Sequence, residues 1–265
     1  MHRIVGVWRS CESVRPMDLG IAGKVALVTG ASKGLGHGIA SALAAEGATV
    51  AVSSRSRERI DEAASAIGGA GFVWDSGDVD GAAGLVSSVE EALGPIDVLV
   101  TNTGGPPAGP DPLGFGTAEW EAAYRTLVLA PMALVGAVVP GMRSRGWGRV
   151  LNVASTTVRE PSPALMLSNS HRAAMVTAFK TVARDVAADG VTLNTLLPGR
   201  IGTARLGELY GSLENAAAGA ASEVPAGRLG TVEEFGAAAA FLCSAPAGYI
   251  TGAALPVDGG LLRSI

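Results

Sequence analysis

Cysteine, aromatic residues and net charge are all scarce in this chain of 265 residues. The two cysteines, Cys11 and Cys243, form neither a disulfide framework nor a metal-ligand spacing, which makes a reducing cytoplasm the expected compartment. Aromatic residues make up 5% of the chain, and the net charge of −4 includes no basic stripe of the kind that binds nucleic acid. We therefore expect no metal site and no nucleic-acid partner, and we expect Cys243 to lie in the core.

Long hydrophobic runs are also lacking. The longest uncharged run, residues 126–142, is short for a membrane span and contains Pro131 and Pro140, which favours a helix buried against the core or a partner subunit. Residues 1–19 lack a convincing secretory signal. We expect them to form a poorly ordered tail, or to reflect a start site assigned before Met17, with one domain over 20–265.

Glycine and small aliphatic residues are abundant, and they follow an alternating pattern of strands and helices. The 37 glycines punctuate short apolar runs, each followed by a segment with helical periodicity. The expected strands are 24–30, 49–55, one within 71–80, 96–105, 148–155, 191–199 and 252–260. This order predicts an α/β fold: a single-domain, Rossmann-like, doubly wound parallel sheet with helices on both faces.

The first strand runs into a glycine-rich turn, TGASKGLG, at residues 29–36. Glycines at such a turn let the backbone bend tightly and approach a pyrophosphate at the N-terminus of the next helix. Glycine turns also occur for purely structural reasons. The position between a strand and a helix, at the start of a run of βα units, favours nucleotide binding here.

Four motifs occur in one order: the glycine turn, GDV at 77–79, TNTGG at 101–105 and LPGRIGT at 197–203. Together they resemble the short-chain dehydrogenase/reductase family over about residues 20–262. The resemblance implies that GDV meets the adenine and that LPGRIGT holds the nicotinamide amide. The implied cofactor-binding residues are Gly30, Ser32, Lys33, Gly34, Leu35, Gly36, Ser54, Arg55, Asp78, Val79, Asn102, Thr103, Gly104, Arg172, Pro198, Gly199, Ile201 and Thr203.

The end of the second strand indicates which nicotinamide cofactor is bound. A carboxylate there would bind the ribose hydroxyls of NAD, but this chain has Ser54 followed by Arg55, with Lys33 in the glycine turn. Two cations without a carboxylate favour the 2′-phosphate of NADP over NAD. The alternative is that Arg55 and Lys33 are ordinary solvated surface charges.

The resemblance also implies four catalytic positions, usually Asn, Ser, Tyr and Lys. The serine aligns with Ser155, but Ser168 stands where the tyrosine belongs and Arg172 where the lysine belongs. Leu127 occupies the asparagine position. A serine hydroxyl is shorter than a phenol and a much weaker acid, and an arginine fork differs from a lysine point charge. The usual proton relay is therefore absent.

His171, one turn from Ser168, is the first candidate to replace the missing acid, because imidazole exchanges protons near neutral pH. We accordingly predict Ser155, Ser168, His171 and Arg172 as the catalytic set. The alternative for His171 is a surface residue on the helix flank. Other polar residues that the fold brings near the cleft, each with packing or solvated surface as its alternative, are Tyr124, Arg159, Glu160, Asn169, Arg200 and Tyr210.

Three functions remain open. The first is an NADP(H)-dependent oxidoreductase acting on a carbonyl or alcohol of a small, fairly hydrophobic molecule, similar to bacterial ketoacyl-acyl-carrier-protein reductases that lack the tyrosine. The second is a cyclase, dehydratase or epimerase in the same pocket, and the third is a nucleotide-binding protein without catalysis. Residues 200–230 are expected to cap the pocket. The helices at 117–142 and 167–189 resemble the family's subunit interface, which predicts a homotetramer or homodimer without a membrane partner.

Overall fold

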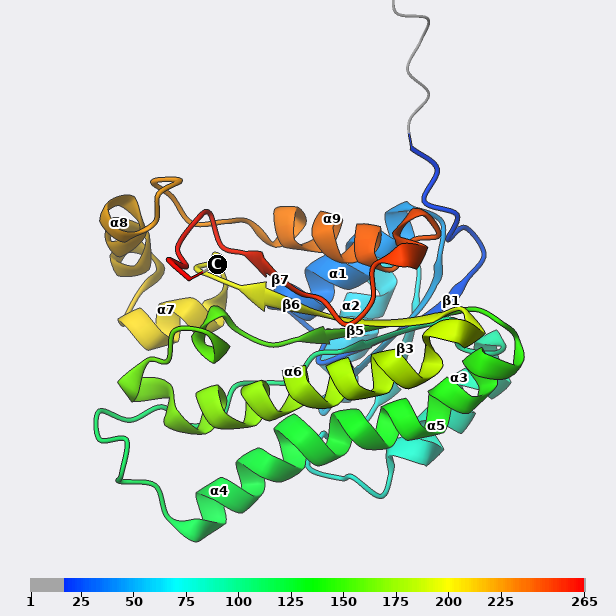
Figure 1. Ribbon diagram of the computed structural model, residues 1–265, viewed down its shortest axis with the longest axis horizontal. Coiled ribbons are helices and arrows are strands. Elements are labelled where there is room, and N and C mark those ends of the chain that lie inside the picture. Colours follow the sequence, from blue (N-terminus) through cyan, green and yellow to red (C-terminus); the bar gives the residue numbers. More distant parts are fainter. Residues whose placement is uncertain (1–16, 265) are drawn as a thin grey trace, which may run out of the picture.

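The computed structural model describes residues 17–264 and contains one seven-stranded sheet (Figure 1). All strand pairs are parallel, and the strand order is β3-β2-β1-β4-β5-β6-β7. The strands are β1 (Val25–Thr29), β2 (Thr49–Ser54), β3 (Ala70–Val73), β4 (Val98–Thr101), β5 (Gly148–Val153), β6 (Val191–Pro198) and β7 (Ala254–Val257). The predicted doubly wound α/β fold is confirmed.

The central strands consist almost entirely of buried residues. Every residue of β1, β4 and β5 is buried, because helices cover both faces of the sheet. This explains why these strands read as continuous apolar runs without the alternation of a half-exposed strand. Thr29 and Asn152 are buried polar exceptions near the carboxyl ends of β1 and β5, where the crevice opens.

Helices form a layer on each face of the sheet (Figure 1). One face carries α1, α2 and α9, and the other carries α3, α5 and α6. Helices α7 and α8 project from the end of the molecule at which β6 finishes. The helices are α1 (Gly34–Ala45), α2 (Arg57–Ile67), α3 (Ala82–Leu93), α4 (Thr117–Tyr124), α5 (Ala130–Ser144), α6 (Met166–Val186), α7 (Ala204–Tyr210), α8 (Leu213–Glu223) and α9 (Val232–Leu242).

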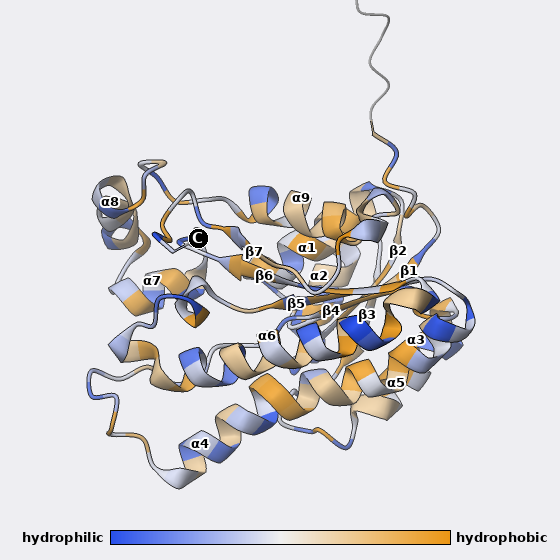
Figure 2. Cartoon of the chain, in the orientation of Figure 1, coloured by the Kyte–Doolittle hydropathy of each residue, from blue (hydrophilic) through white to orange (hydrophobic). Residues whose placement is uncertain are grey.

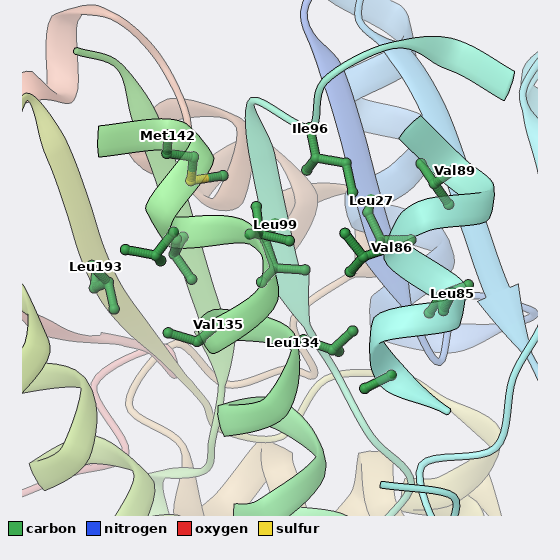
Figure 3. Close-up of a cluster of buried hydrophobic side chains, with 14 of the residues drawn as sticks. Leu27, Leu85, Val86, Val89, Ile96, Leu99, Leu134, Val135, Met142 and Leu193 are labelled. Atoms are coloured by element: carbon green, nitrogen blue, oxygen red, sulfur yellow. The ribbon is translucent and has the colours of Figure 1, made fainter. Parts of the chain in front are cut away.

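Each helical layer closes a hydrophobic core against the sheet. Leu27, Leu99 and Leu134 belong to the core between the sheet and the α3–α5–α6 layer (Figure 3). The second core lies under α1 and α9, and it includes the buried Cys243, as expected from the sequence. Apolar colour accordingly follows the strands and the inward faces of the helices (Figure 2).

Two segments differ in detail from the sequence prediction. The helix expected over 117–142 consists of α4, a π-helical turn at Arg125–Leu129 and α5. The segment 200–230 folds into two short helices, α7 and α8. By length and apolar composition alone, the stretch Thr117–Ser144 reaches what a membrane span needs, but 44% of its most apolar window is buried inside the fold.

The predicted tail lies mostly outside the described residues, as does Cys11. Leu19, which we assigned to this tail, already packs against the α1–α9 core, and its carbonyl accepts a hydrogen bond from the amide of Ala245. Leu19 therefore contacts the domain that we predicted to start at residue 20.

Candidate active site

The strand order reverses between β1 and β4, which places a crevice at the carboxyl ends of these strands. In open α/β sheets, ligands bind at such a switch point, because the loops on its two sides lead to opposite faces. The glycine turn follows β1, the TNTGG loop follows β4, and Ser155 follows β5. The topology thus brings two of the sequence motifs and Ser155 to one edge of the sheet.

The glycine turn is held against the end of β4 by reciprocal hydrogen bonds. Asn102 Nδ2 donates to the Gly30 carbonyl at 3.0 Å, and Thr29 Oγ1 donates to the Asn102 carbonyl at 2.9 Å. Gly30 has a φ of +58°, and a Cβ there would lie 2.6 Å from the Asn102 oxygen. A Cβ on Gly36 would lie 2.5 Å from the Gly30 oxygen. Neither glycine can therefore carry a side chain.

The N-terminus of α1 has no capping side chain of its own. Lys33 occupies the cap position in an extended conformation, and it makes no side-chain cap hydrogen bond. Unsatisfied N–H groups at the start of a twelve-residue helix suit a bound pyrophosphate. Thr203 approaches from the LPGRIGT motif, since its Cγ2 would lie 3.7 Å from a Cβ on Gly34.

The cations predicted to contact a 2′-phosphate are exposed at the ends of β1 and β2. Among residues 17–264, neither Lys33 nor Arg55 has a carboxylate within ion-pair distance. Ser54 Oγ donates to the Ser56 carbonyl at 3.4 Å and brings no negative charge. Asp78 is exposed and accepts from the Gly81 amide at 3.0 Å, whereas Val79 packs against the core.

The opposite side of the crevice is formed by Gly104 and by the segment after β6. Gly104 is exposed and has open space where a Cβ would stand. A Cβ on Gly199 would lie 2.6 Å from that of Asp258, so the turn after Pro198 packs closely against the end of β7. Ile201 is buried and bridges to Gly230. Thr203 caps α7 through a hydrogen bond that its Oγ1 accepts from the Leu206 amide.

Ser155 stands two residues after β5 and keeps its hydroxyl hydrogen available. Its Oγ accepts from the Thr157 amide at 3.2 Å and from Thr157 Oγ1 at 3.0 Å. No hydrogen bond among the described residues has Ser155 Oγ as donor. The two contacts orient the oxygen and leave its hydrogen free for a bound group.

Ser168 and Arg172 lie one turn apart on α6 and are joined. Arg172 Nε donates to Ser168 Oγ at 3.2 Å, and Arg172 Nη1 donates to the Val153 carbonyl at 2.6 Å. Val153 is the last residue of β5, two before Ser155. The structure therefore brings Ser155, Ser168 and Arg172 to the same strand end, and the hydroxyl hydrogen of Ser168 also stays free in the described part of the chain.

The guanidinium of Arg172 is partly buried, and none of residues 17–264 offers it a carboxylate within 4 Å. Burial and, to a smaller extent, the positive charge of Arg205 together lower the pKa of Arg172 to about 10. Arg205 comes from α7, and its Nη2 donates to the Pro106 carbonyl at 2.9 Å. The sequence analysis did not single out Arg205, because a lone arginine in a capping helix carries no local pattern.

His171 turns its ring toward α4. The ring centroid lies 5.3 Å from that of Trp120 and 6.1 Å from that of Tyr124. Nδ1 donates to the Leu167 carbonyl at 2.7 Å. The side chain is buried, which contradicts the surface alternative, and it shares no hydrogen bond with Ser155 or Ser168. Leu127 is buried in the π-helical turn and presents no polar group.

The remaining polar candidates hold the rim of the site together. Asn169 Nδ2 donates to the Ser162 carbonyl at 2.7 Å. The Glu160 carboxylate accepts from the amides of Arg263 and Ser264 at 2.7 and 2.9 Å, and these bonds lower its pKa. Arg159 Nη2 donates to the Ala254 carbonyl.

Two further candidates meet above the site. The guanidinium of Arg200 is paired with Glu223 and lies 5.0 Å from the ring centroid of Tyr210. These contacts join the segment after β6 to α7 and α8. Among the described residues, neither Arg200 nor Tyr210 makes a hydrogen bond to Ser155.

Comparison with known proteins indicates the same family as the sequence motifs. The family described as enoyl-(acyl carrier protein) reductase matches residues 30–262. The 3-oxoacyl-[acyl-carrier-protein] reductase FabG of Haemophilus influenzae is 34% identical over 246 residues, covering 91% of this chain and 99% of the relative. The chain belongs to the short-chain dehydrogenase/reductase family. Human dehydrogenase/reductase SDR family member 4 is also 34% identical, over 95% of this chain and 94% of its own length.

Solved structures of this family superpose on nearly the whole chain. L-sorbose reductase from Gluconobacter frateurii, in complex with NADPH and L-sorbose, matches with a TM-score of 0.88 and 32% identity. The match covers 94% of this chain and all of that one. YwfH, an NADPH-dependent reductase involved in bacilysin biosynthesis, matches with a TM-score of 0.84 and 29% identity over 91% of this chain and 99% of its own.

Proposed function

We propose that this short-chain dehydrogenase/reductase is an NADP(H)-dependent carbonyl reductase that works with an altered proton relay. The observation that carries the proposal is the contact of Arg172 Nε with Ser168 Oγ beside Ser155. Two serine hydroxyls with free hydrogens and one cation face the end of β5, where the family places its reacting carbonyl. The reductases with NADPH that share this fold support the same cofactor here.

The residues of the crevice fit NADP. The uncapped start of α1 and the side-chain-free turn of Gly30 and Gly36 suit a pyrophosphate. Lys33 and Arg55 are exposed, neither is paired with a carboxylate among residues 17–264, and Ser54 brings no negative charge, which supports a 2′-phosphate at this end of the crevice. Open space beside Gly104 leaves room for the cofactor to pass along the end of β4.

The relay is assigned to the three residues at the end of β5. When bound, NADPH supplies the hydride that the carbonyl carbon accepts. Ser155 and Ser168 donate hydrogen bonds to the carbonyl oxygen, and Ser168 passes its proton to that oxygen as the alkoxide forms. Arg172 Nε hands its proton to Ser168 Oγ in return and regains one from solvent. The lowered pKa of Arg172 favours this transfer over one from an ordinary arginine.

His171 remains a weaker candidate for the same relay, since its ring is turned toward Trp120 and Tyr124. Replacing it with glutamine tests that role. We expect His171→Gln to retain most of the reductase activity and Ser168→Ala to lose at least about tenfold in kcat, given the usual contribution of a positioned proton donor. A larger loss in His171→Gln than in Ser168→Ala would reverse the assignment.

The cofactor is tested by calorimetric titration of NADPH and NADH into the purified protein. We expect NADPH to bind at least about tenfold more tightly, because its 2′-phosphate gains charge-assisted contacts. Oxidation of bound NADPH is then followed at its absorbance across a panel of ketones. Equal binding of both cofactors, or tight binding without oxidation by any ketone, would count against the proposal and favour non-redox chemistry in this pocket.

A further inference from the structure

Ser155 and Thr157 form a pair of hydroxyl groups just after the end of β5. Thr157 Oγ1 donates to Ser155 Oγ at 3.0 Å, and the Thr157 amide donates to the same oxygen at 3.2 Å. Both residues are half-buried, and Ser155 begins the short 3₁₀ turn Thr156–Val158. No other two side-chain hydroxyls are joined by a hydrogen bond within residues 17–264.

The hydroxyl of Thr157 makes no other hydrogen bond among the described residues. Several hydroxyls on the helices donate to a backbone carbonyl one turn earlier, as those of Ser87 and Thr181 do at 3.0 Å. Thr157 instead directs its hydroxyl at a side chain of the proposed site. Valine has the same branched shape and would keep the same amide, so the hydroxyl adds a contact to Ser155 rather than to the backbone.

The two contacts fill the acceptor sites of the Ser155 hydroxyl. A serine hydroxyl has one hydrogen to donate and two lone pairs that accept. With the amide and the hydroxyl of Thr157 on these lone pairs, Ser155 can offer only its hydrogen to a bound group. Ser168 differs in the described structure, because its Oγ accepts one hydrogen bond, from Arg172 Nε, and keeps a lone pair.

We infer that Thr157 is a positioning residue that makes Ser155 an obligate hydrogen-bond donor to the carbonyl oxygen of the substrate. This inference rests on the proposed reductase function and deepens it. As hydride reaches the carbonyl carbon, negative charge grows on the oxygen and the hydrogen bond from Ser155 strengthens. Ser155 Oγ gains negative charge in turn, so the two bonds that it accepts from Thr157 strengthen as well. Thr157 thus stabilises the transition state through Ser155, and Ser168 keeps its role as proton donor.

The contribution of Thr157 should appear in kcat more than in KM, because it grows as charge develops on the substrate. Thr157→Val removes only the hydroxyl, and we expect kcat for ketone reduction to fall about threefold to tenfold, as for the loss of one hydrogen bond. Thr157→Ser keeps a hydroxyl and should restore most of this loss. Thr49→Val makes the same exchange at an exposed position at the start of β2, at the opposite end of the sheet, and should leave kcat unchanged.

Infrared spectroscopy tests the same contact without turnover. The probe is cyclohexanone labelled with ¹³C at its carbonyl and bound to the protein saturated with NADP⁺. A donated hydrogen bond weakens the C=O bond and lowers the frequency of its stretch. We expect this frequency to be lowered in the original protein and to be lowered less in Thr157→Val and in Ser155→Ala.

A double-mutant cycle shows whether Thr157 acts through Ser155. In Ser155→Ala the acceptor of both bonds is gone, so adding Thr157→Val should change neither the remaining activity nor the carbonyl stretch. A purely structural role of Thr157 would instead lower the activity equally in both backgrounds. Unfolding curves confirm that each variant is folded.

The outcomes distinguish this inference from the proposed function. An unchanged carbonyl stretch in Thr157→Val, an equal loss of activity in both backgrounds, or no lowering of the stretch in the original protein overturns the inference. If the stretch depends on Thr157 but no ketone oxidises NADPH, the positioning of Ser155 stands and the reductase function falls. If ketones are reduced and Thr157→Val leaves kcat unchanged, the function stands and the inference falls.

Discussion

At the scale of residues, the proposed chemistry depends on Ser168 and Arg172, which the sequence analysis assigned to the positions where the resemblance implies a tyrosine and a lysine. The structure joins these two side chains through one hydrogen bond. Arginine four residues after serine on one helix can reach back to the serine hydroxyl, as a residue pair at this spacing does. Under this assignment, a hydroxyl and a cation stay linked although both groups differ from those that the resemblance implies.

The pH dependence of reduction tests the role of Arg172. The relay needs the protonated guanidinium, and burial lowers the pKa of Arg172 to about 10. The cation is thus complete near neutral pH and lost as pH rises through about 10, so we expect kcat to fall there. The measurement is the rate of NADPH oxidation from neutral to alkaline pH. In Arg172→Gln the remaining activity should lack this fall, and a fall of the same midpoint in that variant would remove Arg172 from the relay.

The preference for NADPH over NADH is a second property that we expect to depend on a single residue, Arg55. Arg55 is exposed and free of carboxylate partners in the described structure, so replacing it should not disturb the fold. We expect Arg55→Gln to weaken NADPH binding about tenfold and to leave NADH binding unchanged, because only the 2′-phosphate loses a charged partner. Calorimetric titration measures both constants. Arg59→Gln serves as the control, and an equal loss for both cofactors would show that Arg55 does not read the phosphate.

At the scale of elements, the N-termini of α1 and α9 differ in whether a side chain caps them. Helix α1 starts without a capping side chain at the cofactor crevice. Helix α9 starts with a complete capping box, in which Thr231 Oγ1 accepts from the Glu234 amide and the Glu234 carboxylate accepts from the Thr231 amide. The N–H groups at the start of α9 are therefore satisfied within the protein, whereas those at the start of α1 are left available to a ligand.

The cap of α9 gives a prediction for stability. Thr231→Ala removes one side of the capping box, and we expect the free energy of unfolding to fall by about 1 kcal/mol. For a domain of this size the thermal midpoint should drop by about 2–4 °C. Differential scanning calorimetry measures the change. Ser87→Ala, which removes only a bond to the Ala83 carbonyl within α3, is the control and should not lower the midpoint.

At the scale of the whole molecule, one face carries an exposed apolar groove. Helices α5 and α6 lie side by side on the surface and form a shallow apolar groove, lined by Met132, Val135, Gly136, Val139, Pro140, Arg143, Val182, Asp185 and Val186. The long apolar stretch Thr117–Ser144 forms one side of this groove. An exposed apolar groove is a typical contact surface between subunits, so our prediction that two copies pair through α5 and α6 stays a prediction with a definite surface to test.

Gly136 offers a sharp test of this pairing. It is exposed in the groove, and a Cβ there would meet nothing within 4 Å, so Gly136→Glu adds a charge without crowding the monomer. We expect light scattering after gel filtration to show a homotetramer or homodimer for the original chain and a smaller species for the variant. Gly84→Glu makes the same change at an equally open position on α3 and should keep the original mass. A monomer in the original chain contradicts the prediction.

The sequence by itself determined that the chain forms a parallel sheet, which motifs follow its strands, and where the glycine turn at residues 29–36 lies. These features are encoded locally, since apolar runs, glycine spacing and helix starts reflect the conformation of neighbouring residues. Gly36 shows this clearly, because a Cβ there would lie 2.5 Å from the Gly30 oxygen of the same turn. Ser155, Ser168 and Arg172 were identified through the resemblance to the family rather than through a local pattern, and the structure places them at the end of β5.

Only the tertiary structure decided which groups face one another across the crevice. His171 is adjacent to Arg172 in sequence, yet its ring packs against α4, because neighbouring positions on a helix point about 100° apart. Arg205 lies far from Arg172 in sequence and acts on its pKa, because α7 folds back over the loop after β4. Such pairings depend on long-range packing, which no local pattern records.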